Sequence, residues 1–364
     1  MPVPLFDTAT PLAPLRERLH AAATGVIDSG RYILGPEVAA FERELADHLG
    51  VRHVVGVANG TDALSLALQA MGVGPGDDVV VPSFTFYASA EAIPATGARP
   101  VFCDVDPETA CVTAQTVRAA LTPNTKAVVT VDLFGNVAPS EEIEALGVPV
   151  LEDAAQALGA RRNGRPAGSF GTAATISFFP SKNLGAFGDA GAVATDDHQV
   201  ADRVRMLRFH GSRDKQTFEL VGRNSRLDEL QAALLRVQLP ELDRWAAARR
   251  AAARAYAEAG LGDVVALPRA VGGAEPAWHL FVVRSDDAAA LEAGLNAAGI
   301  GARRYYTVPV HRQPAMAAMA PGLELPMTDE LARTNLALPM SAALGPEQVA
   351  EVVASVRACA SGST

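Results

Sequence analysis

A lysine within an apolar, glycine-rich stretch is the side chain of this sequence best suited to covalent chemistry. Lys182 lies in SFFPSKNLGAFGDAGAV, residues 177 to 193, and is one of only three lysines in a chain of 364 residues. Lys126 and Lys215 lie in polar stretches and are expected at the surface. A lysine removed from water has a lowered pKa, so its neutral amine can attack a carbonyl and form a Schiff base. The alternative is a lysine whose ammonium group reaches out of a loop into solvent.

A carboxylate ends the apolar segment VPVLEDAA, residues 148 to 155. Glu152 and Asp153 follow an apolar run that has the pattern of a buried strand. Ligands of open α/β sheets bind at the carboxyl ends of the strands. Asp153 in such a place could pair with a protonated ring nitrogen and keep it charged. A helix N-cap is the alternative on position alone.

A possible phosphate seat precedes these groups in ANGTDALSLAL, residues 58 to 68. Asn59 and Gly60 turn the chain out of an apolar run, and Thr61 and Asp62 are typical residues at the start of a helix. The free N–H groups and the dipole of such a helix start attract phosphate. An ordinary capped turn is the alternative, and this motif alone favours it. Together, however, phosphate seat, carboxylate and lysine follow one another on successive strand ends, and pyridoxal 5'-phosphate is the cofactor that uses all three.

The elements that must position these groups form a predicted α/β domain. Apolar, β-rich runs alternate with helical patterns and occupy residues 51–58, 77–83, 98–105, 126–134, 148–155, 172–180 and 191–197. Such an alternation predicts a largely parallel sheet with helices on both sides. A long helix broken at Pro240 follows, then a strand over 277–284 and helices over 287–299 and 345–360. We therefore predict a large domain over residues 1–239, with an N-terminal helix outside the sheet, and a small α+β domain over 240–364.

Composition and charge exclude several classes of protein. Hydrophobic residues make up 49% and charged residues 20% of the chain, as in soluble globular proteins. A net charge of −10 without a basic stripe argues against nucleic acid as a partner. No apolar run is long enough to span a bilayer, and the opening MPVPLFDTATPL lacks the pattern of a signal peptide. Neither the three cysteines nor the seven histidines have metal-ligand spacing. We expect a cytoplasmic protein without a metal or a membrane partner.

The sequence resembles the sugar aminotransferases of the DegT/DnrJ/EryC1/StrS family over nearly its whole length. The motifs that carry the resemblance are SGRYILGPEVAAFE (29–42), ANGTDALSLAL (58–68), PSFTFYASAEAI (82–93), LEDAAQALGA (151–160), SFFPSKNLGAFGDAGAV (177–193), NSRLDELQAA (224–233), YYTVPVHRQP (305–314) and LALPMS (336–341). Their joint order and spacing make the match specific. The resemblance implies the fold of the fold-type I pyridoxal phosphate enzymes, with a seven-stranded, mostly parallel sheet in the large domain.

The resemblance also implies roles for individual residues. Lys182 should form the Schiff base and then move the proton, and Asp153 should keep the pyridine nitrogen protonated. The remaining cofactor contacts implied are Gly60, Thr61 and Ser177 at the phosphate, Phe86 stacked on the ring, Gln156 near the ring hydroxyl or ring face, and Asn224 reaching the phosphate from the other subunit of a homodimer. Tyr306 and His311 match positions near the nucleotide sugar, with ordinary loop packing as the alternative for both. His279 is expected to be a strand residue of the small domain rather than a ligand.

The function implied is transfer of an amino group, usually from L-glutamate, to a keto sugar linked to a nucleoside diphosphate. Many relatives have histidine where Gln156 stands, and glutamine favours a 3-keto over a 4-keto sugar. Arg223 replaces an aromatic or aliphatic residue that is frequent before Asn224, which leaves the nucleotide open. Relatives that dehydrate sugars typically replace the Schiff-base lysine by histidine, so Lys182 argues against that reaction. The alternatives left open are a 4-keto sugar, a broader amine transaminase of the same fold, and a non-catalytic regulator that binds the cofactor.

Overall fold

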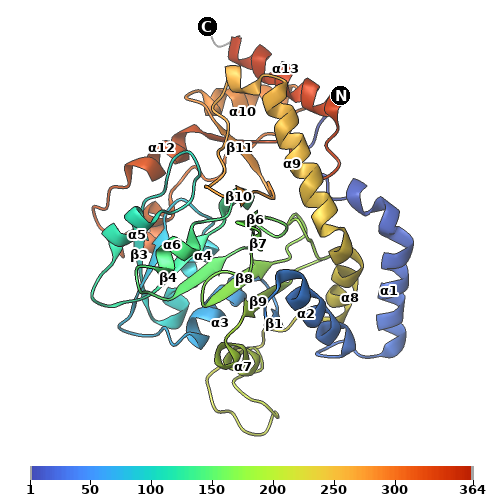
Figure 1. Cartoon of the computed structure of the whole chain (residues 1–364), viewed down its shortest axis with the longest axis vertical. Helices are drawn as coiled ribbons and strands as arrows, with labels where there is room; N and C mark the ends of the chain where they lie inside the picture. The colour runs from blue at the N-terminus through green and yellow to red at the C-terminus, as the bar shows by residue number, and fades with distance from the viewer. Residues whose placement is uncertain (1, 362–364) are drawn as a thin grey trace.

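A seven-stranded sheet lies at the centre of the computed structural model, which describes residues 2–361 (Figure 1). Its strands are β1 (His53–Val57), β2 (Asp78–Pro82), β3 (Arg99–Cys103), β4 (Thr125–Val131), β5 (Val150–Asp153), β8 (Ala173–Ser177) and β9 (Gly191–Thr195). They lie in the order β1-β9-β8-β5-β4-β2-β3. β9 pairs antiparallel with β1 and with β8, and the remaining neighbouring strands pair parallel. The predicted sheet is therefore confirmed.

Helices cover both faces of this sheet. Val54 of β1 packs in one hydrophobic core with α2 (Pro36–Leu49) and α8 (Glu229–Gln238). Val55, the next residue, packs in a second core with α3 (Gly60–Ala70) and α7 (His198–Leu207). Successive side chains of a strand point to opposite faces, so the two cores lie on opposite sides of the sheet. The second core also contains residues of the short helices α4 (Ala88–Glu91), α5 (Ala114–Ala120) and α6 (Ser140–Glu144).

The C-terminal part of the chain builds a third core. The predicted break at Pro240 is present, because the short helix η4 (Leu239–Glu241) separates α8 from α9 (Leu242–Glu258). Beyond α9, β11 (Phe281–Arg284) pairs with β12 (Asn335–Leu338), and α10 (Ala288–Ala297) and α13 (Pro346–Ser361) pack in the same core. The helices α11 (Pro314–Ala317) and α12 (Pro326–Thr334) lie between α10 and β12 in the chain. Val3 joins this third core although it lies at the start of the chain. The domain boundary between residues 239 and 240 stays a prediction.

The N-terminal helix α1 (Arg16–Ser29) packs against α8 and lies outside the sheet, as predicted (Figure 1). Local sequence patterns did not predict α2, α7 or β12. They also missed a small sheet in which β6 (Arg161–Arg162) pairs with β7 (Arg165–Pro166) and β10 (Ala274–Glu275). These strands have two residues each, too short to leave a pattern in the sequence.

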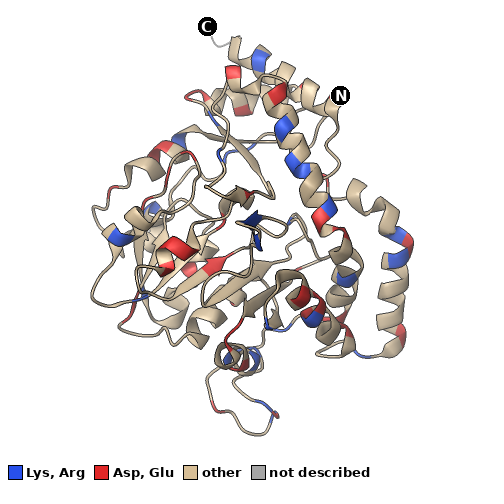
Figure 2. Ribbon diagram, viewed as in Figure 1, with Lys and Arg blue, Asp and Glu red and all other residues tan. Residues whose placement is uncertain are grey.

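Charged residues of both signs are interspersed along the outer helices, including α1 and α9 (Figure 2). Within residues 2–361, no helix combines the length and the apolar character that crossing a membrane requires.

Candidate active site

A cavity of about 840 Å³ opens at the carboxyl ends of β5 and β8 and at the start of α3. Among the residues that line it are most of those predicted for the site: Gly60, Thr61, Phe86, Asp153, Gln156, Ser177, Lys182 and Tyr306. Side chains and turns more than two hundred residues apart in sequence therefore meet in one place, at the edge of the sheet where α/β folds bind ligands.

Lys182 lies in a tightly closed loop that follows β8. Its backbone N–H donates to the carbonyl of Phe179 at 2.8 Å, and Ala186 N–H donates to the carbonyl of Phe178 at 2.7 Å. Gly185 is required in this loop, because a Cβ there would lie 2.5 Å from the carbonyl oxygen of Pro180. Burial lowers the pKa of Lys182 to about 8, and the negative charge of Asp153 opposes that shift. A minor fraction of the amine is therefore neutral at pH 7, far more than for an ordinary lysine, and this form can act as nucleophile or base.

Asp153 ends β5 with its carboxylate in the cavity and is only 4% exposed. Ser89 donates its hydroxyl proton to Asp153 Oδ2 at 2.7 Å, and Ala155 N–H donates to Oδ1 at 3.2 Å. Burial raises the pKa of Asp153, whereas these two donors and the charge of Lys182 act in the opposite direction. A cationic group bound beside this carboxylate would favour its ionised form further.

Glu152, the neighbouring acid, has a different role. Its two carboxylate oxygens accept the N–H groups of Gly168 at 2.8 Å and Phe170 at 2.7 Å. It is fully buried and does not line the cavity. Alternation along β5 thus directs Asp153 to the cavity and Glu152 into a turn, which decides between the two acids that the sequence placed together.

The start of α3 provides an anion seat in the same cavity. The Asn59 side chain accepts the N–H of Asp62 at 2.8 Å and caps the helix. The N–H groups of Gly60 and Thr61 precede any carbonyl that could accept them within the helix, so they are free for a ligand. Ser177, at the end of β8, lies against this turn, because a Cβ on Gly60 would come within 2.8 Å of the Ser177 Cβ. Glycine at position 60 is what allows the helix start to approach the strand.

An amide and a phenol form the opposite wall. Gln156 Oε1 accepts the backbone N–H of Phe134 at 2.7 Å, and its Nε2 donates to the Tyr306 hydroxyl at 3.3 Å. This pairing fixes which end of the amide faces Tyr306. Burial raises the pKa of Tyr306, which stays a neutral donor. Phe86 is 54% exposed, and its ring centre lies 6.1 Å from that of Tyr306. An exposed aromatic at a cavity mouth is available for stacking on a bound ring.

Two predicted residues lie outside the lining of this cavity. Asn224 is exposed, in the segment after α7, where the preceding Arg223 bonds to Asp62 at 3.3 Å and Ser65 at 3.0 Å on α3. A contact of Asn224 across a subunit interface stays a prediction. His311 is 3% exposed, and its Nδ1 lies 2.6 Å from the Ser83 hydroxyl. These contacts favour loop packing, the alternative that the sequence left open for His311.

The structure adds two residues that sequence reasoning did not place in the site. Ser89 fixes Asp153, but a serine in a short helix carries no signal of that contact. His279 was predicted as a strand residue, and this is corrected: β11 begins at Phe281, and His279 lines the cavity at 4% exposure. Its ring stacks on Phe6 at 6.0 Å, and burial, with the charges of Lys182 and Arg249, lowers its pKa, so it is neutral. Within residues 2–361, the cavity included, no three His, Cys, Asp or Glu side chains are grouped to hold a metal ion.

The chemistry of the cavity fits pyridoxal 5'-phosphate. It combines a partly neutral lysine amine, a buried carboxylate held by two donors, and a helix start with free N–H groups. These match, in turn, the aldehyde, the ring nitrogen and the phosphate of that molecule.

Comparison with known proteins agrees with this geometry. The model of the DegT/DnrJ/EryC1/StrS aminotransferase family matches residues 14–357. The chain is 44% identical over 362 residues to a dTDP-3-amino-3,4,6-trideoxy-alpha-D-glucose transaminase of Streptomyces venezuelae, covering 98% of this chain and 95% of the relative. It is 42% identical over 361 residues to a pleiotropic regulatory protein of Geobacillus stearothermophilus, covering 97% of each.

Solved structures of other proteins are also similar to this chain over nearly its whole length. The chain superimposes on DesV of S. venezuelae with a TM-score of 0.95 and 44% identity, covering 99% of this chain and 98% of the other. The ntda protein of Bacillus subtilis, solved with bound cofactor PMP, gives a TM-score of 0.88 and 29% identity, covering 96% of this chain and 82% of the other.

Proposed function

Because the chain belongs to the DegT/DnrJ/EryC1/StrS aminotransferase family, we propose that it moves an amino group from an amino acid donor, L-glutamate, to a 3-keto sugar carried on a nucleoside diphosphate. The reaction uses pyridoxal 5'-phosphate, held by the residues of the 840 Å³ cavity. The single observation that carries the proposal is that Lys182, Asp153 and the start of α3 line this one cavity.

When bound, pyridoxal 5'-phosphate supplies an electron-withdrawing ring that stabilises negative charge on the carbon next to the transferred nitrogen. Residues of the chain transfer the proton and keep the ring nitrogen charged. Lys182 Nζ, whose pKa burial lowers to about 8, would take the proton from that carbon and pass it to the cofactor carbon C4′, on the other side of the transferred nitrogen. Asp153 keeps the ring nitrogen protonated, because its carboxylate is buried and oriented by Ser89 and Ala155.

The remaining residues orient the reactants. Gly60 and Thr61 hold the phosphate through backbone N–H groups and Ser177 through its hydroxyl. Phe86 would stack on the ring, and Gln156 would contact its face or its hydroxyl. In the proposed homodimer, Asn224 reaches the phosphate of the neighbouring subunit.

The acceptor is proposed to be a 3-keto sugar. The relative from S. venezuelae is named for transfer to position 3, and Gln156 stands where histidine is frequent in the family. Tyr306 is fixed by Gln156 with its hydroxyl in the cavity wall and can donate to a sugar oxygen. A contact of His311 with the nucleotide requires the loop that carries it to rearrange, since its Nδ1 pairs with Ser83.

The test is an assay of purified, cofactor-loaded protein with L-glutamate and a panel of dTDP- and UDP-linked 3-keto and 4-keto sugars. Formation of 2-oxoglutarate with a 3-keto sugar supports the proposal. Turnover with 4-keto sugars alone would reject amination at position 3 of the sugar. Turnover with simple ketones but with no nucleotide sugar would reject nucleotide sugars as the substrate class.

A second function is favoured by the regulatory name of the G. stearothermophilus relative, which is 42% identical. A regulator that only binds the cofactor would keep one absorbance spectrum when glutamate is added. An aminotransferase converts the aldehyde form to the amine form, so the long-wavelength band disappears.

A further inference from the structure

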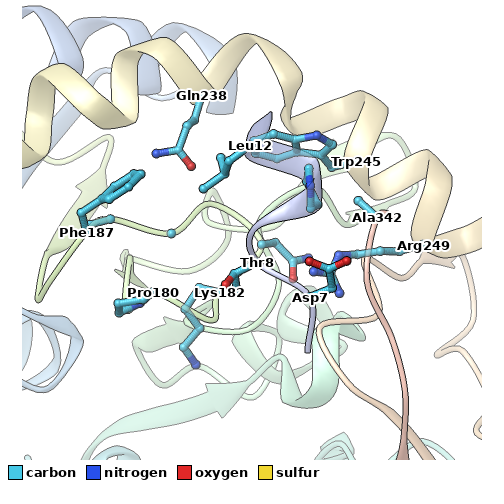
Figure 3. Close-up of a pocket in the computed structure, with 14 residues that line it drawn as sticks. Asp7, Thr8, Leu12, Pro180, Lys182, Phe187, Gln238, Trp245, Arg249 and Ala342 are labelled. Carbon is cyan, nitrogen blue, oxygen red and sulfur yellow. The ribbon is translucent and has the colours of Figure 1, made fainter. Parts of the chain in front are cut away.

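A second cavity of about 290 Å³ lies on the other side of the loop that carries Lys182 (Figure 3). Its walls are the N-terminal segment with Asp7 and Leu12, the loop from Pro180 to Phe187, and side chains of α8 and α9. Lys182 is the only described residue that lines both cavities. Figure 3 shows its amine pointing away from the second cavity, so this cavity is separate from the proposed catalytic site.

Arg249 of α9 gives this cavity a buried positive charge. Its side chain is 8% exposed, and its Nη1 donates to the carbonyls of Trp278 at 3.2 Å and Met340 at 3.4 Å. Its Nε has no hydrogen-bond partner. No carboxylate of residues 2–361 lies within ion-pair distance of it, and burial lowers its pKa to about 10. A buried charge without a counter-ion is costly, so an anion that reached the guanidinium would be bound strongly.

The rest of the lining limits what that anion can be. Leu12, Ala186, Phe187, Trp245 and Ala342 are apolar residues of the lining, and Trp245 and Ala342 lie on the same side of the view as Arg249 in Figure 3. Apolar walls disfavour a doubly charged phosphate or sulfate, which a single arginine would only half neutralise.

Besides Arg249, and Lys182 whose amine points away, the half-exposed carboxylate of Asp7 lines the cavity. Its Oδ1 accepts the N–H groups of Ala9 at 3.1 Å and Thr10 at 2.9 Å. Asp7 repels a dianion more strongly than a monoanion. A planar carboxylate is also the group that the free edge of a guanidinium recognises best.

We propose that this cavity binds a small monocarboxylate with a short apolar body, its carboxylate on Arg249 and its body against Trp245 and Leu12. The ligand would contact the loop from Pro180 to Phe187, and so the segment that presents Lys182 to the catalytic cavity. Asn183 ties this loop to the rest of the fold, since its Nδ2 donates to the carbonyls of Leu158 at 3.1 Å and Ala277 at 3.2 Å.

The probe is butanoate, titrated into the full-length holoprotein by calorimetry, with butylammonium chloride and sodium sulfate as controls. We expect saturable binding of butanoate and no binding of butylammonium or sulfate. Ala342→Phe fills the cavity without touching the hydrogen bonds of Arg249, and should weaken butanoate binding roughly tenfold or more. Ala343→Phe, next in the chain and outside the lining, is the matched control and should bind as the wild type does.

Binding in the catalytic cavity must be distinguished from binding here. Crystals grown with 2-bromobutanoate should show the anomalous signal of bromine between Arg249 and Trp245. Absence of butanoate binding, equal binding to Ala342→Phe, or bromine found only beside Lys182 Nζ and Asp153 would each overturn the proposal. Sulfate binding as tight as butanoate would overturn its selectivity for a monocarboxylate.

Discussion

Ser89 Oγ lies 2.7 Å from Asp153 Oδ2 and donates its proton to it. Both side chains are buried, and Ser89 in turn lies 3.0 Å from the hydroxyl of Thr85. The hydrogen bond therefore fixes the carboxylate in one orientation and stabilises its charged form. The proposed role of Asp153 at a ring nitrogen depends on this neighbour in α4, which prevents the carboxylate from rotating away.

Ser89→Ala should raise the pKa of Asp153 further, since it removes the donor that opposes the effect of burial. A hydrogen bond to a charged group contributes about 1.5–3 kcal/mol, so we expect kcat to fall roughly tenfold or more while the fold persists. Single-turnover kinetics with glutamate would measure the loss. Ser140→Ala is the matched control, because Ser140 is a buried serine whose hydroxyl lies 3.0 Å from that of Thr130 and which does not line the cavity. Equal rates in the two variants would show that Ser89 does not act through Asp153.

Lys182 should titrate at a pKa of about 8 in the protein without cofactor. Asp153 raises that value, so Asp153→Asn should move the midpoint of the Lys182 titration to lower pH. The chain has only three lysines, and ¹³C-methylation followed by NMR therefore gives a spectrum that Lys182→Ala can assign. Asp189→Asn is the control, because Asp189 lines the same cavity but does not contribute to the pKa of Lys182. An upward shift in Asp153→Asn would contradict the assigned geometry.

Gly60→Ala should damage the phosphate seat. Its Cβ would come within 2.8 Å of the Ser177 Cβ, so the start of α3 must move away from β8. We expect a loss of about 1–3 kcal/mol in the free energy of unfolding. The preference of the protein for pyridoxal phosphate over pyridoxal should also fall. Gly74→Ala is the control, since nothing lies within 4 Å of the added carbon. If Gly60→Ala preferred pyridoxal phosphate over pyridoxal as strongly as the wild type does, the start of α3 would not be the phosphate site.

Asn224 tests whether two subunits share a site. Lys182→Ala and Asn224→Ala should each be nearly inactive alone. Mixed and allowed to exchange subunits, they should recover about a quarter of wild-type activity, because half of the dimers would each contain one intact site. No recovery, in a mixture shown by mass spectrometry to contain mixed dimers, would mean that Asn224 acts within its own chain.

Local patterns predicted much of the fold and part of the site. The apolar runs of β1 to β5 and the break at Pro240 are visible because burial on two faces and the loss of an N–H leave strong local signals. Lys182 was singled out by its apolar surroundings. The choice of Asp153 over Glu152 as the acid that faces the ligand follows from strand alternation once the register is known.

The remaining contacts depend on tertiary packing. His279 and Ser89 enter the site through packing between segments distant in sequence, and neither has a local motif. For His311 the motif left a ligand contact and loop packing open, and its burial against Ser83 favours packing in this structure. The four residues of β12 could not be distinguished from a loop before their pairing with β11 was known.

The central claim is that Lys182 is the side chain that bonds to pyridoxal 5'-phosphate. Borohydride reduction of the yellow, cofactor-loaded protein, followed by peptide mapping, tests it most directly. The account predicts a phosphopyridoxyl label on Lys182 and no label in Lys182→Ala. A label on Lys126 or Lys215, or equal labelling of the Lys182→Ala protein, would contradict it.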